Sequence, residues 1–183
     1  FAVDQVLNID CIEELTSHPL NGDFAGRRRN GRQSFYKSPA SLLRPTATGA
    51  EILSRVVDYT YGEIAPCCMG IFENKRGGRI CVAGYYPWDQ LQNLSKSTQI
   101  KAVMQWLSKD NLAAHISSFH RINLWVRETA PGRHAIALLN AYGDPAEAIE
   151  IIVRTEQPTL TFYDNHGTQT TVPASETQSG ESR

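Results

Sequence analysis

The chain has 183 residues, of which 41% are hydrophobic, 20% charged and 9% aromatic, and its formal net charge is -1. This composition is ordinary for a folded globular protein and argues against disorder of the whole chain. A charge so close to zero gives no general attraction to nucleic acid or to an anionic membrane, so neither is expected as a partner. No run of about 18 apolar residues is present, so the sequence predicts no membrane-spanning helix.

The first residues lack the basic and apolar segments of a secretory leader, so we expect no signal peptide within the chain. The chain begins with Phe1 instead of a methionine, so we expect it to be cut from a longer protein or processed. These features predict a soluble protein, with a cytoplasmic location slightly favoured.

Four cysteines stand at positions 11, 67, 68 and 81. Their spacing contains no CxxC pair and does not suit zinc. We predict that they are small buried hydrophobic groups, and a disulfide between two of them stays open. Neither a metal nor another cofactor is predicted.

Residues 1–16 mix apolar and acidic side chains without a period that decides between strand and helix. Residues 21–48 contain three glycines and two prolines, which predicts a long loop, or loops around one short strand. A basic cluster in this stretch consists of Arg27, Arg28, Arg29 and Arg32. We expect a solvated or ion-paired loop there, and an anion-binding patch is the alternative.

Residues 48–51 form a capping-box pattern, and apolar residues follow at helical spacing, which predicts a short helix near 49–59. Strands are predicted over 65–72 and 79–83. The turn between them contains two glycines, so the pair is expected to form a β-hairpin.

A second helix is predicted near 95–108, because apolar residues recur there at three- and four-residue intervals. The residues of this stripe are Ile100, Val103, Met104 and Leu107. Trp106 lies off the stripe. It is expected to pack on a neighbouring element, and the alternative is an interface anchor.

From residue 111 the hydrophobic period changes to two, which is typical of half-buried strands. Strands are predicted over 120–127, with Trp125 on the polar side, and over 133–139. Residues 149–154 also alternate, although a helix opened by Asp144-Pro145 is an alternative. Residues 160–172 give a strong hairpin signal around a turn.

The change of period divides the chain into an α/β part over 1–112 and an antiparallel β-sandwich over 113–173. Residues 174–183 are all small or polar, which predicts a disordered tail.

The order of these elements and the stretch GRICVAGYYPWD at 78–89 resemble the C-terminal half of bacterial β-galactosidase-type glycoside hydrolases. The resemblance covers roughly residues 16–172. It implies a flavodoxin-like layer related to class I glutamine amidotransferases, here incomplete at its N-terminus, which serves trimerisation and precedes a small β-sandwich. In such enzymes a (β/α)8 barrel carries the catalytic carboxylates, and this sequence shows no barrel.

The resemblance also allows a test for amidotransferase chemistry. It aligns Tyr86 with the catalytic histidine and Trp88 with the glutamate that orients it. A phenol with a pKa of about 10 is a poor base at neutral pH, and an indole accepts no hydrogen bond. The glycine-flanked nucleophile elbow is also missing around Cys67 and Cys68. The two aligned positions therefore predict a degenerate site, and no catalytic residue is predicted.

We therefore predict a non-catalytic assembly or accessory region, which packs on its own catalytic barrel or on identical subunits. The candidate interface or sugar-stacking residues are Tyr85, Tyr86, Trp88, Trp106 and Trp125. The alternative is a carbohydrate-binding module that uses these aromatics. A cysteine hydrolase of the amidotransferase type is the third, disfavoured hypothesis.

Overall fold

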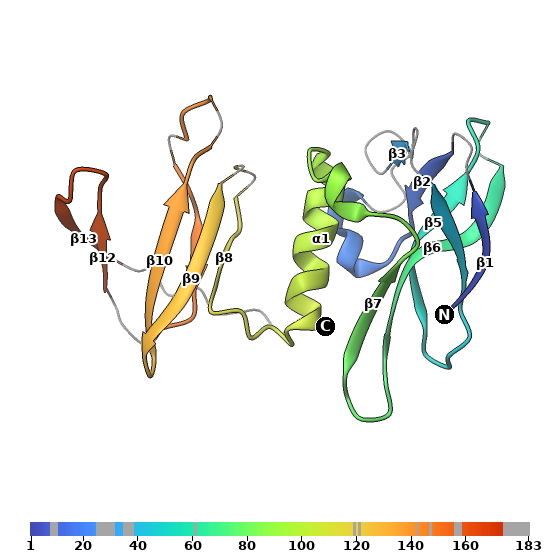
Figure 1. The fold of residues 1–183 in the computed structure, drawn as a ribbon, viewed down its shortest axis with the longest axis horizontal. Coiled ribbons are helices and arrows are strands. Elements are labelled where there is room, and N and C mark those ends of the chain that lie inside the picture. Colours follow the sequence, from blue (N-terminus) through green and yellow to red (C-terminus); the bar gives the residue numbers. More distant parts are fainter. Residues whose placement is uncertain are drawn as a thin grey trace. The chain divides into compact units, whose positions relative to one another are not determined.

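The computed structural model describes residues 1–7, 11–24, 32–34, 39–60, 62–118, 120, 122–141, 143–146, 148–155 and 159–173. This part of the chain is mostly β, with one α-helix and several small antiparallel sheets (Figure 1). It divides into two compact units, residues 1–110 and 111–183.

The first unit is built on a five-stranded antiparallel sheet in the order β3-β2-β5-β6-β7. Its strands are β2 (Ile12–Leu15), β3 (Arg32–Ser34), β5 (Glu51–Val57), β6 (Glu63–Glu73) and β7 (Arg79–Ala83). Two further strands, β1 (Ala2–Leu7) and β4 (Ala40–Arg44), pair with each other. The central strands β5 and β6 pair along both edges, and their buried side chains pack in a core with residues of α1 and β4.

Gly84, directly after β7, is where β4 meets the large sheet. The backbone N–H of Ser41 donates to the Gly84 carbonyl, and the Gly84 N–H donates to the Cys68 carbonyl. A Cβ at position 84 would overlap the carbonyl oxygen of Ser41. The close approach of the two backbones therefore requires glycine.

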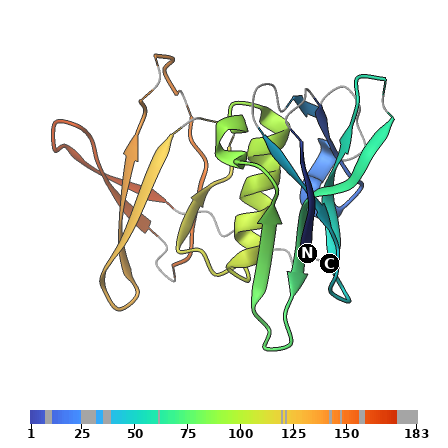
Figure 2. The same ribbon diagram turned by 45° about the vertical axis from the view of Figure 1, so that its right-hand side comes forward.

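Helix α1 (Leu94–Leu107) packs against the 3-10 turns η1 (Pro19–Phe24) and η2 (Pro87–Gln90) and against β7 (Figures 1 and 2). The Asn93 side chain caps it by accepting a hydrogen bond from the Ser95 N–H. Ile100 and Val103 are buried in a core that also contains the sheet residues Leu53, Val56, Met69 and Ile71.

The structure confirms the predicted hairpin of 65–72 with 79–83 and the helix predicted over 95–108. Both rest on local signals, a glycine-containing turn and a helical stripe. Of that stripe, Ile100 and Val103 are buried, whereas Met104 is exposed.

The short helix predicted near 49–59 is wrong, because these residues form strand β5. Gly49 adopts a φ of +80°, which ends the capping-box pattern in a turn. Consecutive residues of β5 are buried, Leu53 with Ser54 and Val56 with Val57, and its register against β6 shifts three times. Its apolar residues therefore lose the two-residue period of a half-buried strand. Residues 1–16 contain strands β1 and β2, and residues 21–48 contain η1, β3 and β4 where mainly loop was expected.

The flavodoxin-like part of the predicted fold is not confirmed. A flavodoxin-like layer is a parallel sheet with helical crossovers, whereas every strand pair of the described chain is antiparallel. The short turns between β5, β6 and β7 permit only antiparallel neighbours.

Within the described residues, the second unit contains three two-stranded antiparallel sheets, β8–β11, β9–β10 and β12–β13. The strands are β8 (Ala114–Ile116), β9 (Asn123–Ala130), β10 (Arg133–Leu139), β11 (Ile151–Val153), β12 (Thr159–Tyr163) and β13 (Gln169–Pro173). The antiparallel character and the last hairpin were predicted correctly, and the alternative helix opened by Asp144-Pro145 is wrong. The described strands form separate pairs instead of the two larger sheets of a sandwich.

Two predictions concern parts of the chain that the structure does not describe. Arg27, Arg28 and Arg29 and the tail 174–183 lie outside the described residues. Arg32 lies in β3, and its side chain is also outside them.

Candidate functional site

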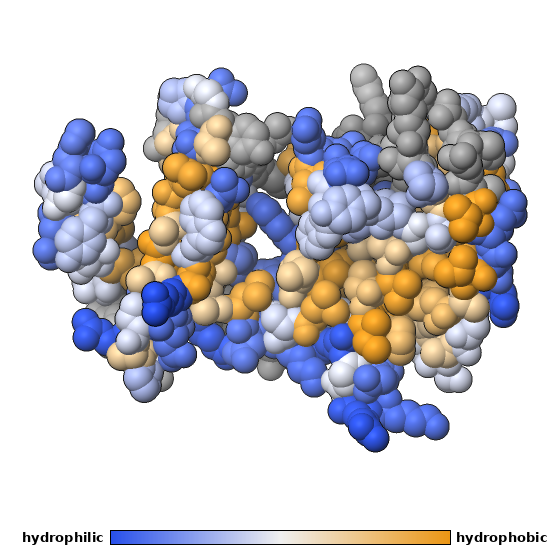
Figure 3. All heavy atoms as spheres, in the orientation of Figure 1, coloured by the Kyte–Doolittle hydropathy of each residue, from blue (hydrophilic) through white to orange (hydrophobic). Residues whose placement is uncertain are grey.

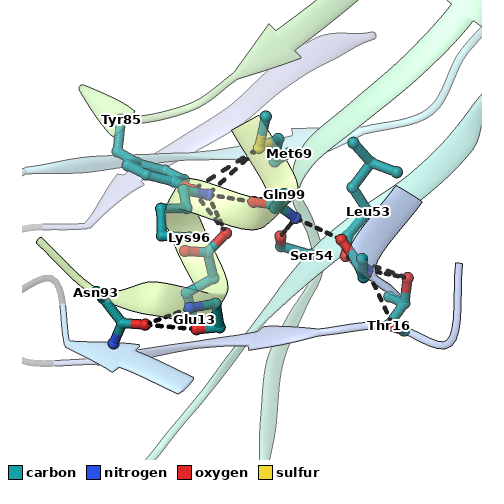
Figure 4. A network of polar contacts seen from close by, with 11 residues as sticks. Glu13, Thr16, Leu53, Ser54, Met69, Tyr85, Asn93, Lys96 and Gln99 are labelled. Atoms are coloured by element: carbon teal, nitrogen blue, oxygen red, sulfur yellow. Dashed lines mark hydrogen bonds and ion pairs between the residues drawn. The ribbon is translucent and has the colours of Figure 1, made fainter. Parts of the chain in front are cut away.

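A buried polar network joins α1 to the sheet of the first unit, with Lys96 and Glu13 at its centre (Figure 4). Both side chains are fully buried. Lys96 Nζ lies 2.9 Å from Glu13 Oε1, 2.6 Å from Gln99 Oε1 and 3.4 Å from Met69 Sδ. It also donates to the Tyr85 hydroxyl.

Tyr85 contacts the same carboxylate oxygen as Lys96. Its hydroxyl donates to Glu13 Oε1 at 2.6 Å, and the Lys96 ammonium lies 4.7 Å from the centroid of its ring. Burial, with the negative charge of Glu13 second, raises the pKa of Tyr85 well above its usual value. The phenol therefore stays a neutral donor at physiological pH.

Gln99 extends the network away from the ion pair. Its Nε2 donates to Asn21 Oδ1 at 2.7 Å and to Ser54 Oγ at 3.0 Å. Asn21 in turn donates to the backbone carbonyls of Thr16 and Leu53. The chain of contacts thus ties α1 to η1, β2 and β5.

This arrangement suits structure better than catalysis. Exposure does not exceed 9% for Glu13, Tyr85, Lys96 or Gln99, so a substrate cannot reach the charged atoms. Within the described part of the chain, Glu13 Oε2 has no hydrogen-bond partner. A buried pair with one orphaned oxygen adds little net stability, yet it fixes how the helix sits on the sheet.

Sequence reasoning missed this network, although a signal for its centre was present. Lys96 stands four residues before Ile100 and seven before Val103, so it continues the buried stripe of α1. A lysine on a buried stripe requires an acidic partner. The identity of that partner, Glu13, depends on long-range packing.

The cysteines are also unsuited to nucleophilic chemistry. Burial raises the pKa of Cys67 and of Cys81 to about 11, and it raises that of Cys68 well above its usual value. Since the thiolate is the nucleophile, such thiols are unreactive at neutral pH. All four cysteines lie in the described residues, and none of them forms a disulfide.

His18 has both ring nitrogens engaged. Its Nδ1 accepts from the Leu20 N–H at 3.2 Å, and its Nε2 lies 2.9 Å from Glu51 Oε2. This geometry closes the turn into η1 and leaves neither nitrogen to act as a general base.

The predicted aromatic residues lie in different environments. Tyr85 is buried in the network, whereas its neighbour Tyr86 is 64% exposed and Trp88 is 47% exposed. These last two form what we call the aromatic surface of the first unit. Trp106 packs on a neighbouring strand: the Arg79 guanidinium lies 5.1 Å from its ring centroid and donates to its carbonyl at 2.7 Å. Trp125, in β9 of the second unit, is 54% exposed.

Over the described residues, no three or more His, Cys, Asp or Glu side chains are grouped so that they could hold a metal ion. No helix in the same residues is both long and apolar enough to cross a membrane. Comparison of the chain with protein-family models, curated proteins and solved structures gives no match.

Proposed function

We propose that this chain is a non-catalytic assembly and accessory region that binds another protein through the aromatic surface of its first unit. The observation that supports this best is that reactive side chains are buried, whereas the aromatic side chains of this surface are exposed. The groups that could perform chemistry, Lys96, Glu13 and Tyr85, are sealed in the core, whereas Tyr86 and Trp88 reach solvent. Exposed aromatic side chains next to a rigid sheet are typical anchors of protein interfaces.

The identity of the proposed partner follows from the sequence resemblance. Residues 78–89 carry the resemblance to β-galactosidase-type glycoside hydrolases, so the partner is the catalytic barrel of such a protein or an identical subunit. The flavodoxin-like layer is not carried into the proposal, because the sheet is antiparallel.

Sedimentation velocity over a concentration series tests the proposal for identical subunits. We expect the chain to associate, and Tyr86→Ser with Trp88→Ser to weaken association by about tenfold or more. Tyr59→Ser is the matched control, because Tyr59 is 57% exposed in another turn of the same unit. A double variant that associates as tightly as the parent chain would contradict a role for the aromatic surface.

A carbohydrate-binding module is the second candidate, favoured by the exposed indoles of Trp88 and Trp125. Indole faces stack on sugar rings, and stacking changes their fluorescence. Titration with galactosides and plant polysaccharides is expected to give a saturable change that Trp88→Ser or Trp125→Ser removes. No saturable change at millimolar sugar would eliminate this candidate.

A further inference from the structure

The second unit contains a cleft of about 680 Å³, which is within the range of about 300–1,000 Å³ typical of binding sites. One wall includes residues 136–138 of β10, and the other includes residues 161–163 of β12 with the following turn. The other described lining residues are Ile122, Asn140, Ala146 and Ile149. The cleft thus lies between two of the hairpins.

Both walls are strand edges. Successive side chains of a strand point to opposite faces, so a cleft that touches three consecutive residues runs along the edge of that strand. Among the strands that the structure describes, β10 pairs with β9 alone and β12 pairs with β13 alone. The remaining edge of each carries backbone N–H and C=O groups without a ladder partner.

Burial is sparse in the part of the second unit that the structure describes, where Ala114 and Ile116 of β8 are the buried residues. No residue of β9, β10, β11, β12 or β13 that the structure describes is buried. Apolar side chains of β9 and β10 reach the surface, as Figure 3 shows. Isolated two-stranded hairpins are marginally stable in water, and a third strand with an apolar face is needed.

We infer that this cleft takes an extended segment of a partner polypeptide, which adds as a strand between β10 and β12. The inserted backbone would satisfy both open edges and would join the two hairpins into one sheet of the order β9-β10-partner-β12-β13. A sugar or another small ligand would leave the backbone groups of one edge or both unpaired. This inference concerns the second unit and does not depend on the aromatic surface of the first.

The lining of the cleft defines the chemistry of the segment. Ile136, Leu138 and Phe162 make its walls apolar, which suits a segment with apolar residues at every second position. Asp164 is the one charged residue among the described lining residues. Hydrogen bonds from the backbone, that of Thr168 first, lower its pKa, so its carboxylate is ionised at neutral pH. We therefore expect a lysine or arginine at the end of the segment that lies beside Asp164.

Selection of a displayed library of random nine-residue peptides on the whole chain tests the inference. We expect the enriched peptides to alternate apolar and polar residues and to carry a basic residue near one end. Each synthesised peptide should slow hydrogen exchange at residues 136–138 and 161–163. Methylation of alternate backbone nitrogens removes the edge-facing N–H groups, and it should weaken binding by about tenfold or more.

A pair of variants on one strand supplies the matched control. Leu138 lines the cleft, whereas its neighbour Leu139 does not and is 50% exposed. Leu138→Lys should weaken peptide binding by about tenfold or more, and Leu139→Lys should change it by less than about twofold. Unchanged exchange of the β9 amides in both variants shows that the hairpin remains formed.

Four results would overturn the inference. One is the absence of peptides with a two-residue period among those enriched. Another is equal binding of the N-methylated peptide. The third is protection outside 136–138 and 161–163. The last is self-association of the chain that protects these same residues, which would make a second copy the occupant of the cleft.

Discussion

The two units bury their apolar side chains to very different extents. In the described chain, every buried hydrophobic residue except Ala114 and Ile116 lies within residues 1–110. As far as the structure describes them, the first unit has a five-stranded sheet with a helix packed on it, whereas the second has three pairs of strands. The strands of the second unit have a regular two-residue hydrophobic period. The difference in burial between the units therefore comes from the number of elements that pack around each strand, and not from the local pattern.

The polar groups follow the same division. In the first unit, Lys96 donates hydrogen bonds to both Glu13 and Gln99 in the core. In the second, contacts such as those of Asp164 with the backbone of His166 and Thr168 lie at the surface. The first unit therefore holds a polar network in its core, whereas the polar contacts of the second lie at the surface, beside open strand edges.

The largest expected effect is at the buried ion pair. Lys96→Met leaves the Glu13 carboxylate buried without its cation, and it should lower the free energy of unfolding of the first unit by about 3–5 kcal/mol. The double variant Lys96→Met with Glu13→Leu should recover most of this loss, because an apolar pair of similar volume is tolerated. The free energy of unfolding of both variants is measured by urea unfolding, with hydrogen exchange of the β5 and β6 amides as the readout. A loss below about 1 kcal/mol in the single variant would show that the pair is not buried.

Truncation of one leucine in each unit tests the comparison directly. Leu53 has an exposure of 0%, so Leu53→Ala should cost about 2–5 kcal/mol through lost burial and a cavity. Leu138→Ala should cost less than about 1 kcal/mol, because Leu138 is only half-buried and lines an open cleft, so its truncation leaves no closed cavity. Equal costs, measured from urea unfolding of each unit, would mean that the second unit has a core after all.

A methyl group at Gly84 is the next effect in size. Gly84→Ala drives a Cβ into the Ser41 carbonyl and should cost about 1–3 kcal/mol in the first unit. Gly143→Ala is the control in the second unit, because a Cβ there has no atom within 4 Å. Thermal unfolding compares the two variants. An unchanged midpoint for Gly84→Ala would show that β4 does not lie against the backbone at the end of β7.

The smallest effect concerns pH. Folding raises the pKa of Cys67 and Cys81 from 9.0 to about 11, so the stability that their protonated forms contribute is present below pH 9 and is lost as the pH rises through about 11. The pKa of Tyr85 is raised as well, which acts in the same direction above pH 10. We expect the urea concentration at the unfolding midpoint of the first unit to fall as the pH is raised from 8 to about 10. The fall should be smaller in the Cys67→Ala, Cys81→Ala double variant than in the parent chain. An equal fall in the two proteins would show that other groups cause the loss of stability.

The sequence predicted the elements whose signals are local. The hairpin of β6 and β7 follows from its glycine turn, and α1 follows from the spacing of Ile100 and Val103. Strand β5 was missed because its register shifts against β6 and its packing in the core depend on distant parts of the chain, which no local period records. The open edges of the second unit depend on which strands pair, so they too are visible only in the structure.

The candidate site shows the same limit at the level of single residues. Tyr85 and Tyr86 are adjacent and alike in sequence, yet one is buried in the network and the other is exposed. The difference comes from the Tyr85 hydroxyl, which reaches Glu13 across 72 positions of sequence. Lys96 alone carried a readable signal, its place on the stripe of α1.

Native-state hydrogen exchange of the whole chain, resolved by segment, tests the contrast between the units most directly. Amides of β5, β6 and α1 should be protected up to the full free energy of unfolding of the first unit. Amides of β10 and β12 should exchange far faster, by local opening of single hairpins. Protection of β10 and β12 equal to that of β5 and β6 would contradict the account, because the second unit would then be complete without a partner strand.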